Sequence, residues 1–496
     1  MSTNKTLRCV AKPVGLLLVI VLCTTAALPA AEPARPNVLL IAIDDLNDWV
    51  GPLGGHAAVQ TPHMDRLAAR GTTFLNAHCQ SPLCNPSRTS FMLSLRPSTT
   101  GVYALEPSHY ALPALKQRVS LFEHFKSSGY GVYTVGKLWH HGLSPEQRRR
   151  ELTELGTPGK LIRPGRPFAV TPSKHPLVDW GPFPASDEEH YDYQTAQWAI
   201  DRLQSRPKDP FMLAVGFSLP HVPCFAPRKW FDLYPDDDSL LPEIDENDRD
   251  DVPDFAWRLH WQLPEPRLKW LQESGQWQPL VRAYLASISL VDAQVGRVLE
   301  ALEKSGQAGN TVVVLLSDHG WHLGEKGISG KNTLWERSTR VPLIIAGPGV
   351  DEKAKCMRPA ELLDLYPTLI DLCNLPARDV LEGHSLLPQL RDADAFRKQP
   401  AITTHGPGNH AVRDERWRYI RYADGSEELY DMDADPREWK NLAAEAKWED
   451  VKRDLAAWLP KRSAPPAPGS KSRLVELKEG KVYWETRLIG PEPVPD

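Results

Sequence analysis

Short apolar runs alternate with helix-like patterns along most of this 496-residue chain. The runs are rich in β-branched residues and lie at 38–43, 131–135, 211–216, 311–316 and 341–346. Between them, helical spacing of apolar residues marks 64–70, 121–127, 287–303 and 361–372. Strands without polar alternation are typical of a parallel sheet that helices cover on both faces. The sequence therefore predicts an α/β fold with a large, mostly parallel sheet sandwiched by helices.

The pattern changes from about residue 391. Polar and apolar residues alternate over 411–421, and a turn-forming Ala-Asp-Gly at 423–425 precedes another strand-like run. This part predicts a small antiparallel sheet with one late helix, then a Pro-rich linker and a loosely attached tail. The expected organisation is a signal peptide at 1–31, the α/β domain at 32–390, a C-terminal α+β subdomain at 391–462, and a linker and tail at 463–496.

The first 31 residues have the pattern of a secretory signal peptide. Lys5, Arg8 and Lys12 make the start basic, 14–22 is apolar, and small residues occupy 26–31. The apolar stretch is short for a membrane span, so an uncleaved anchor is the weaker alternative. Since no other long apolar run follows, we expect an exported protein, periplasmic or secreted, with no membrane span after cleavage.

Charge and cysteine content argue against two classes of protein. The formal net charge is −5 and there is no basic tract, which argues against a nucleic-acid partner. The cysteines after the signal are sparse, odd in number and without pattern, so they predict no disulfide framework. They are Cys79, Cys84, Cys224, Cys356 and Cys373. An acidic stretch at 236–254 predicts a solvated loop, with a calcium site as the weaker alternative.

The motif Leu-Cys-Asn-Pro-Ser-Arg at 83–88 places a thiol just before an expected helix. Asn85 suits the N-cap of that helix, and Pro86 suits its first position. The free amides and positive dipole end of the helix would favour negative charge beside Cys84. The alternative is a small apolar cysteine packed beside a capped helix.

Ionisable residues follow four of the expected strands. In an open α/β sheet, ligands bind beyond the carboxyl ends of the strands. The residues at these ends are Asp44 and Asp45, then Lys137 and His140, then His221, and finally Asp318 and His319. Each case alone is typical of a surface loop, but together with Cys84 they predict one common site.

Three carboxylates in this set predict a bound cation. Asp44, Asp45 and Asp318 would repel one another in a buried cluster unless a positive ion lay between them. Carboxylate oxygens suit a hard ion such as Ca²⁺ or Mg²⁺. His319 adds a nitrogen ligand or donates a hydrogen bond instead. The alternative is that Asp44 caps a helix and Asp45 is exposed.

Further positive charge near the same strand ends predicts an anionic substrate. Arg88, Lys137 and Lys331 would surround the dication, an arrangement that makes sense only if an anion enters. His140 and His221 are candidates for proton donors, or for hydrogen-bond donors to that anion.

These residues, taken in order, resemble the sulfatase family of the alkaline-phosphatase-like superfamily. The Cys-x-Pro-Ser-Arg signature stands at 84–88, and the other matching blocks are Asp44-Asp45, Gly136-Lys137 with His140, Pro220-His221, Ser317-Asp318-His319-Gly320 and 331–336. The similarity covers roughly 37–442 and looks closest to the iduronate-2-sulfatase-like branch. It implies an alkaline-phosphatase-like fold and a sulfuric ester hydrolase.

The resemblance also implies the cofactors. Cys84 would be converted to formylglycine by a formylglycine-generating enzyme or an anaerobic sulfatase-maturing enzyme. The aldehyde hydrates to a geminal diol: one hydroxyl attacks sulfur and expels the alcohol, and deprotonation of the other eliminates sulfate. A Ca²⁺ ion, or less favourably Mg²⁺, would activate the hydroxyl and polarise the sulfate. Its ligands would be Asp44, Asp45, Asp318, His319 and the modified Cys84.

The remaining roles follow from the same resemblance. Arg88 would hold the diol near the metal, and Lys137, His221 and Lys331 would bind sulfate oxygens. His140 would assist elimination of sulfate, whereas Lys331 or His221 would donate a proton to the leaving alcohol. The expected substrate is a sulfated oligo- or polysaccharide, which places the enzyme in polysaccharide degradation.

The sequence departs from the family pattern at two places. Leu93-Ser94 stand where the family usually has Thr-Gly, a change that bears on how efficiently Cys84 is converted. Leu219 stands where the branch tends to have a basic residue before Pro-His, so we expect a contact to a substrate carboxylate to be missing.

Two other functions remain open. One is a phosphate mono- or diester hydrolase on the same scaffold, which the full signature and the single metal cluster disfavour. The other is a catalytically silent carbohydrate-binding protein in which Cys84 stays unmodified. A plain thiol hydrolase is less favoured still, because no Cys-His-Asn pattern is apparent.

Overall fold

The computed structural model describes residues 1–11, 35–208 and 210–490. The chain divides into two units, 1–35 and 36–496, and the first has no helix or strand in its described part. The apolar core and the cleavage region of the predicted signal, 14–22 and 26–31, lie outside the described residues. No helix of the described residues has the length and apolar character needed to cross a membrane.

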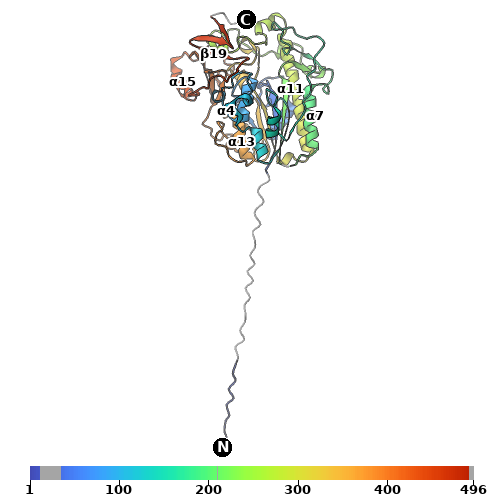
Figure 1. Ribbon diagram of the computed structural model, residues 1–496, viewed down its shortest axis with the longest axis vertical. Coiled ribbons are helices and arrows are strands. Elements are labelled where there is room, and N and C mark those ends of the chain that lie inside the picture. Colours follow the sequence, from blue (N-terminus) through green and yellow to red (C-terminus); the bar gives the residue numbers. More distant parts are fainter. Residues whose placement is uncertain (12–34, 209, 491–496) are drawn as a thin grey trace. The chain divides into compact units, whose positions relative to one another are not determined.

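An eight-stranded sheet forms the centre of the second unit (Figure 1), in the order β13-β2-β12-β9-β1-β7-β4-β5. The five strands that the apolar runs predict are β1 (Asn37–Asp44), β4 (Gly131–Gly136), β7 (Phe211–Pro220), β9 (Thr311–Ser317) and β12 (Leu343–Ala346). The outer strands are β2 (Gly71–Phe74), β5 (Glu154–Leu155) and β13 (Ala354–Cys356). In the middle, β1 pairs in parallel with both β7 and β9.

One predicted strand runs the other way. β12 is antiparallel to both β9 and β2, so the sheet is mixed but mostly parallel. An apolar run buried on both faces reads the same in either direction, and the sequence therefore could not give the orientation of β12. The predicted fold class is confirmed.

Two helical layers cover the sheet, and β1 shows why. Leu39, Ile41 and Ile43 contribute to one buried cluster, whereas Val38 and Leu40 contribute to the other. The first cluster includes α7 (Tyr191–Gln204) and α11 (Trp277–Lys304); the second includes α5 (Leu121–Ser127) and α13 (Leu365–Leu372). Alternate β1 side chains point to opposite faces, so both layers are needed to bury them. Figure 1 shows α7 and α11 on one side of the sheet and α13 on the other.

Short elements connect these layers. The remaining helices are α1 (Pro62–Ala68), α2 (Cys84–Leu93), α3 (Pro97–Thr100), α4 (Pro113–Lys116), α6 (Pro145–Glu151), α8 (Arg228–Phe231), α9 (Asp254–Arg258), α10 (Leu268–Glu273), α12 (Glu336–Thr339), α14 (Leu387–Arg391) and α15 (Glu449–Ala456). Short strands outside the main sheet are β3 (Ala77–His78), β6 (Trp180–Pro182), β8 (Cys224–Ala226), β10 (His322–Leu323), β11 (Ser329–Gly330) and β14 (Ala360–Glu361).

The C-terminal part contains the antiparallel sheet that the sequence predicts. Its strands are β15 (Ala401–Thr404), β16 (His410–Arg413), β17 (Trp417–Arg421) and β18 (Glu427–Asp431), and α15 follows them. The boundaries of the predicted domains stay predictions.

The end of the chain differs from the loose tail that we expected. It forms a three-stranded antiparallel sheet of β19 (Val475–Lys478), β20 (Lys481–Trp484) and β21 (Arg487–Ile489). Val475, Trp484 and Ile489 are buried in one cluster with Trp335 and Tyr430. The strands are too short to show a clear alternation in the sequence, and long-range burial holds them in place.

The acidic stretch at 236–254 is mostly exposed, as expected of a solvated loop. One of its acidic residues, Asp248, is buried and pairs with Lys326 Nζ at 2.5 Å. Among the described residues, no cluster of metal-ligating side chains lies in this stretch, so the weaker calcium alternative has no support there.

Candidate active site

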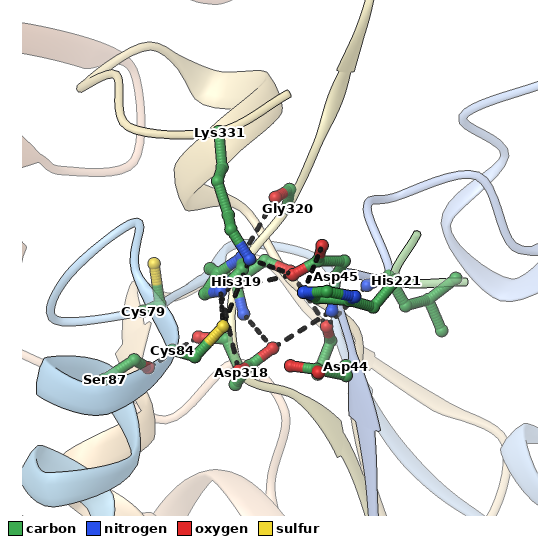
Figure 2. A network of polar contacts seen from close by, with 12 residues as sticks. Asp44, Asp45, Cys79, Cys84, Ser87, His221, Asp318, His319, Gly320 and Lys331 are labelled. Carbon is green, nitrogen blue, oxygen red and sulfur yellow. Dashed lines mark hydrogen bonds and ion pairs between the residues drawn. The ribbon is translucent and has the colours of Figure 1, made fainter. Parts of the chain in front are cut away.

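The predicted site residues converge at the carboxyl ends of the central strands (Figure 2). β1 ends at Asp44 with Asp45 directly after it, β9 leads into Asp318 and His319, and β7 leads into His221. Because these strands are parallel neighbours, their ends meet at one edge of the sheet. Cys84, the first residue of α2, lies against the same edge.

The chain turns sharply after β1, and this turn positions Asp45. Asp45 has a φ of 62°, a left-handed conformation that is unfavourable for most residues but tolerated by aspartate. Its amide donates to Asp318 Oδ1 at 3.1 Å, and its carbonyl accepts from Tyr284 Oη at 2.7 Å. Sequence reasoning missed Tyr284, since a tyrosine within the apolar pattern of α11 carries no signal of its own.

Helix α2 starts two residues earlier than the sequence predicts. Its N-cap is Leu83, so Asn85 is not the cap and Pro86 is not the first helical residue. The Asn85 side chain instead donates to the carbonyls of Ala104 and Pro107, at 2.9 and 3.0 Å. The prediction was wrong because the helix already includes Asn85, whose Nδ2 donates to two carbonyls that the local sequence could not indicate. Cys84 nevertheless lies at the helix N-terminus.

The thiol of Cys84 is surrounded by cationic and polar groups. Lys331 Nζ lies 3.1 Å from Sγ and His319 Nε2 lies 3.3 Å from it, while only 1% of the residue is exposed. Burial and Asp44 raise the pKa of this thiol, but Lys331, His319 and a hydrogen bond with His140 together bring it well below its usual value. The site therefore stabilises negative charge at position 84.

Arg88 connects the carboxylates of two strands. Its Nε lies 2.9 Å from Asp318 Oδ2, and its Nη2 lies 2.8 Å from Asp44 Oδ1. The remaining nitrogen donates to the carbonyls of Lys137 and Leu138. Burial alone would lower the pKa of this guanidinium, but the two aspartates raise it, so Arg88 is a permanent cation. One planar group thus fixes three loops relative to one another.

Burial and charge set the protonation of the acidic groups. Burial opposes ionisation of Asp44, yet Lys137 and Arg88 hold its pKa well below its usual value. For Asp318, burial outweighs Arg88 and raises the pKa to about 8. Burial would lower the pKa of His319, but Asp318 raises it to about 9. Burial and neighbouring charges thus move the pKa values of these three groups away from their usual ones.

The donor set fits a divalent cation. One ligand atom each from Asp44, Asp45, Cys84 and His319 lies within 4.8 Å of the others. Asp45 Oδ2 is buried and has no hydrogen-bond partner, which is costly unless an ion completes it. Asp318 is the fifth predicted ligand. Its Oδ2 pairs with Arg88, and its Oδ1 accepts hydrogen bonds from the amides of Asp45 and His319. The structure thus groups four of the five predicted ligands directly, with Asp318 hydrogen-bonded to two of them.

Of the other predicted residues, Lys137 and His221 are partly exposed beside the carboxylates, whereas Lys331 is buried. Lys137 Nζ lies 3.6 Å from Asp44 Oδ2 and His221 Nε2 lies 3.9 Å from Asp45 Oδ2. Their side chains are 26% and 23% exposed, whereas the Lys331 side chain is only 3% exposed. His221 Nδ1 is paired with the Val222 carbonyl at 2.6 Å, which leaves Nε2 facing the carboxylates.

Leu219 cannot contact a substrate. It is fully buried in the core, and its amide donates to Asp192 Oδ2 at 2.9 Å. The missing contact to a substrate carboxylate stays a prediction.

Known proteins resemble this chain over most of its length. The model of the sulfatase family matches residues 36–375, and that of the N-sulphoglucosamine sulphohydrolase C-terminal region matches 324–464. A sulfatase of Formosa agariphila is 41% identical over 447 residues, which is 87% of this chain and 88% of that protein. Human iduronate 2-sulfatase is 30% identical, over 75% of this chain and 76% of that protein. The solved structure of a 2-O GAG sulfatase matches with a TM-score of 0.67 and 25% identity, covering 86% of this chain and 91% of that one.

Proposed function

Because this chain belongs to the sulfatase family and is thus a sulfuric ester hydrolase, we propose that it removes sulfate from a sulfated oligo- or polysaccharide. We propose further that Cys84 is converted to formylglycine before the enzyme acts. One observation carries this proposal: the Cys84 sulfur lies within 3.3 Å of both Lys331 and His319, beside the paired aspartates.

The carboxylate-rich group would hold the metal. Asp44, Asp45, His319 and position 84 would be its ligands, with Asp318 as the further predicted one. Hard oxygen donors favour Ca²⁺, and Mg²⁺ is the alternative. When bound, the ion would lower the pKa of the attacking hydroxyl and polarise a sulfate oxygen.

The Cys84 sulfur stands where the hydroxyls of hydrated formylglycine would lie. That group supplies one hydroxyl to attack sulfur and a second whose deprotonation releases sulfate. Lys137, His221 and Lys331 would hold the sulfate oxygens as the bond to the sugar oxygen breaks. Lys331 or His221 would protonate the departing alcohol. His140, whose pKa is lowered by burial, would accept a proton from position 84.

Two considerations support the substrate class and the compartment. Human iduronate 2-sulfatase and the 2-O GAG sulfatase, both similar to this chain, are by name sulfatases of a uronate and of GAG. The basic, apolar and small-residue order of the first 31 residues supports export to the periplasm or beyond.

The test begins with maturation. Peptide mass spectrometry of the Cys84 fragment, from a host with a formylglycine-generating or anaerobic sulfatase-maturing enzyme, should show aldehyde in place of thiol. The wild type should then release sulfate from at least one member of a panel of defined sulfated saccharides, and Cys84→Ala should not. Full turnover by Cys84→Ala would sink the proposal.

The same preparation separates the alternatives. Turnover of an aryl sulfate well above that of the matching aryl phosphate supports a sulfatase, whereas the reverse order identifies a phosphoester hydrolase. A titratable thiol at Cys84, combined with glycan binding but no sulfate release, identifies the silent binding protein.

A further inference from the structure

The start of the C-terminal sheet region lies between the loops that support Cys84 and Lys331. The amides of Leu105 and Glu106 donate to the carbonyls of Ser472 and Lys471, at 3.2 Å each. The Leu105–Glu106 loop in turn sits beside the carbonyls that anchor Asn85, next to Cys84. Segment 471–473 is therefore fixed close to the site, although it comes from the far end of the chain.

The Arg473 side chain connects this segment to the residues around Lys331. Its two terminal nitrogens donate to Asn332 Oδ1 at 3.0 Å and to Glu265 Oε1 at 3.1 Å. Its amide donates to Glu485 Oε1 at 3.1 Å. Ser472 and Arg473 both have a φ of 69°, a conformation that non-glycine residues keep only when their surroundings impose it.

The two acceptors of Arg473 border Lys331 on either side. Asn332 follows Lys331, is fully buried and has a φ of 76°. Gly330 precedes Lys331, and a Cβ placed there would lie 3.2 Å from the Glu265 side chain. Glu265 thus packs against Gly330, before Lys331, and Arg473 donates a hydrogen bond to Asn332, after it.

We propose that Arg473 is a positioning residue for Lys331: it locks the backbone from which Lys331 Nζ reaches Cys84. This rests on the proposed function in one respect, namely that Lys331 binds sulfate. Lys331 Nζ contacts Asp45 Oδ1 at 2.7 Å and Cys84 Sγ at 3.1 Å. Because a lysine side chain has four rotatable bonds, the position of its backbone decides whether Nζ reaches both partners at once. A shift of about 1 Å at such a group lowers rates by up to about 100-fold.

Sulfate binding and turnover test the proposal on matured, metal-loaded enzyme. Arg473→Ala should weaken the binding of inorganic sulfate, measured by calorimetry, by about 10-fold and lower kcat/KM for an aryl sulfate by about 10- to 100-fold. Arg473→Lys keeps a charge for Glu265 but cannot bridge both acceptors, and should lose most of the same activity. Arg473→Ala combined with Glu265→Gln removes the unpaired buried charge and keeps the test valid if Arg473→Ala folds poorly.

A double-mutant cycle with Lys331→Ala decides between positioning and a merely structural role. If Arg473 acts through Lys331, then Arg473→Ala changes sulfate affinity by less than about 2-fold when Lys331 is already alanine. An equal loss in both backgrounds, or no loss in either, overturns the proposal. Lys471→Ala is the matched control, because its side chain is 62% exposed and pairs with Glu106, which is itself exposed. It should leave affinity and kcat/KM unchanged.

The failure of this proposal is distinguishable from failure of the proposed function. A wild-type enzyme that turns over sulfate esters while Arg473 variants behave additively contradicts the positioning role alone. A wild type that neither binds nor releases sulfate contradicts the assignment of Lys331 itself.

Discussion

Arg88 pairs with Asp44 and Asp318 through one guanidinium group that is almost fully buried. Lysine cannot satisfy both carboxylates together with the Lys137 and Leu138 carbonyls. We expect Arg88→Lys to lower kcat by about 100-fold and to destabilise the protein by at least about 2 kcal/mol, because buried acceptors lose their donors. Steady-state kinetics and urea unfolding measure the two effects.

Arg70→Lys is the control for that prediction. Arg70 also pairs with a carboxylate, that of Glu303, but both side chains are about 40% exposed. Exposed pairs contribute little, so this change should alter stability by less than about 0.5 kcal/mol and leave kcat unchanged. Equal effects of the two substitutions would contradict the role of burial.

His190 should make stability depend on pH. It is buried at the start of α7, where Nδ1 accepts from the Asp192 amide at 3.1 Å, and burial lowers its pKa to about 3. The unfolded chain, with a histidine pKa near 6.5, binds more protons below that pH than the folded protein does. His190 therefore contributes to stability fully above about pH 6.5, and this contribution falls as pH decreases toward 3.

His190→Asn keeps a hydrogen-bond acceptor at the helix start but cannot bind a proton. Between about pH 6 and 4, the slope of unfolding free energy against pH should decrease by up to about 1.4 kcal/mol per pH unit. Urea unfolding at several pH values measures this slope. An unchanged slope would mean that His190 takes up its proton in the folded state.

At the scale of elements, the end of α2 explains the unusual Leu93-Ser94 pair. Ser94 follows the helix with a φ of 51°, a position that glycine usually fills. Ser94 Oγ donates to the Leu363 carbonyl at 2.8 Å and accepts from the Gly383 amide at 3.1 Å. These two bonds offset the cost of the left-handed backbone and connect the end of α2 to the segments before and after α13.

Two substitutions of Ser94 separate the cost of the left-handed backbone from the contribution of the two hydrogen bonds. Ser94→Ala keeps the strained backbone and loses both hydrogen bonds, whereas Ser94→Gly loses the bonds but relieves the strain. We expect Ser94→Ala to be the less stable variant by about 1 kcal/mol. Urea unfolding gives the difference, and a Gly variant less stable than the Ala variant would refute this explanation.

At the scale of the whole molecule, the ion should join distant parts of the chain. Its predicted ligands come from β1, α2 and the end of β9, which are far apart in sequence. Removal of the ion by a chelator should lower Tm by a few degrees and abolish sulfate release, and Ca²⁺ should restore both.

Asp45→Asn should abolish the response of Tm to Ca²⁺, because Asp45 Oδ2 has no hydrogen-bond partner and lies 3.9 Å from His221 Nε2. Asp371→Asn, at an exposed position of α13, is the control and should respond like the wild type. A chelator that leaves Tm and activity of the wild type unaltered would exclude the ion from the site.

Much of the site could be predicted because its residues directly follow strands. Asp44, His221 and Asp318 stand at or beyond strand ends, so a parallel arrangement of the strands was enough to bring them together. The direction of β12 could not be predicted, because its neighbours lie elsewhere in the sequence. The prediction that Asn85 caps α2 failed for the same reason, because the carbonyls of Ala104 and Pro107 that accept from its side chain lie well beyond that helix in the sequence.

The sequence by itself determined the chemistry of this protein: the thiol, the acidic pair and the cations stand in recognisable local order, which needs no knowledge of packing. Only the tertiary structure decided the partners, such as Arg88 between two aspartates and Arg473 beside Asn332. These contacts join residues that no local periodicity relates. They exist because burial leaves each charge or amide without water, and the fold must supply the missing partner.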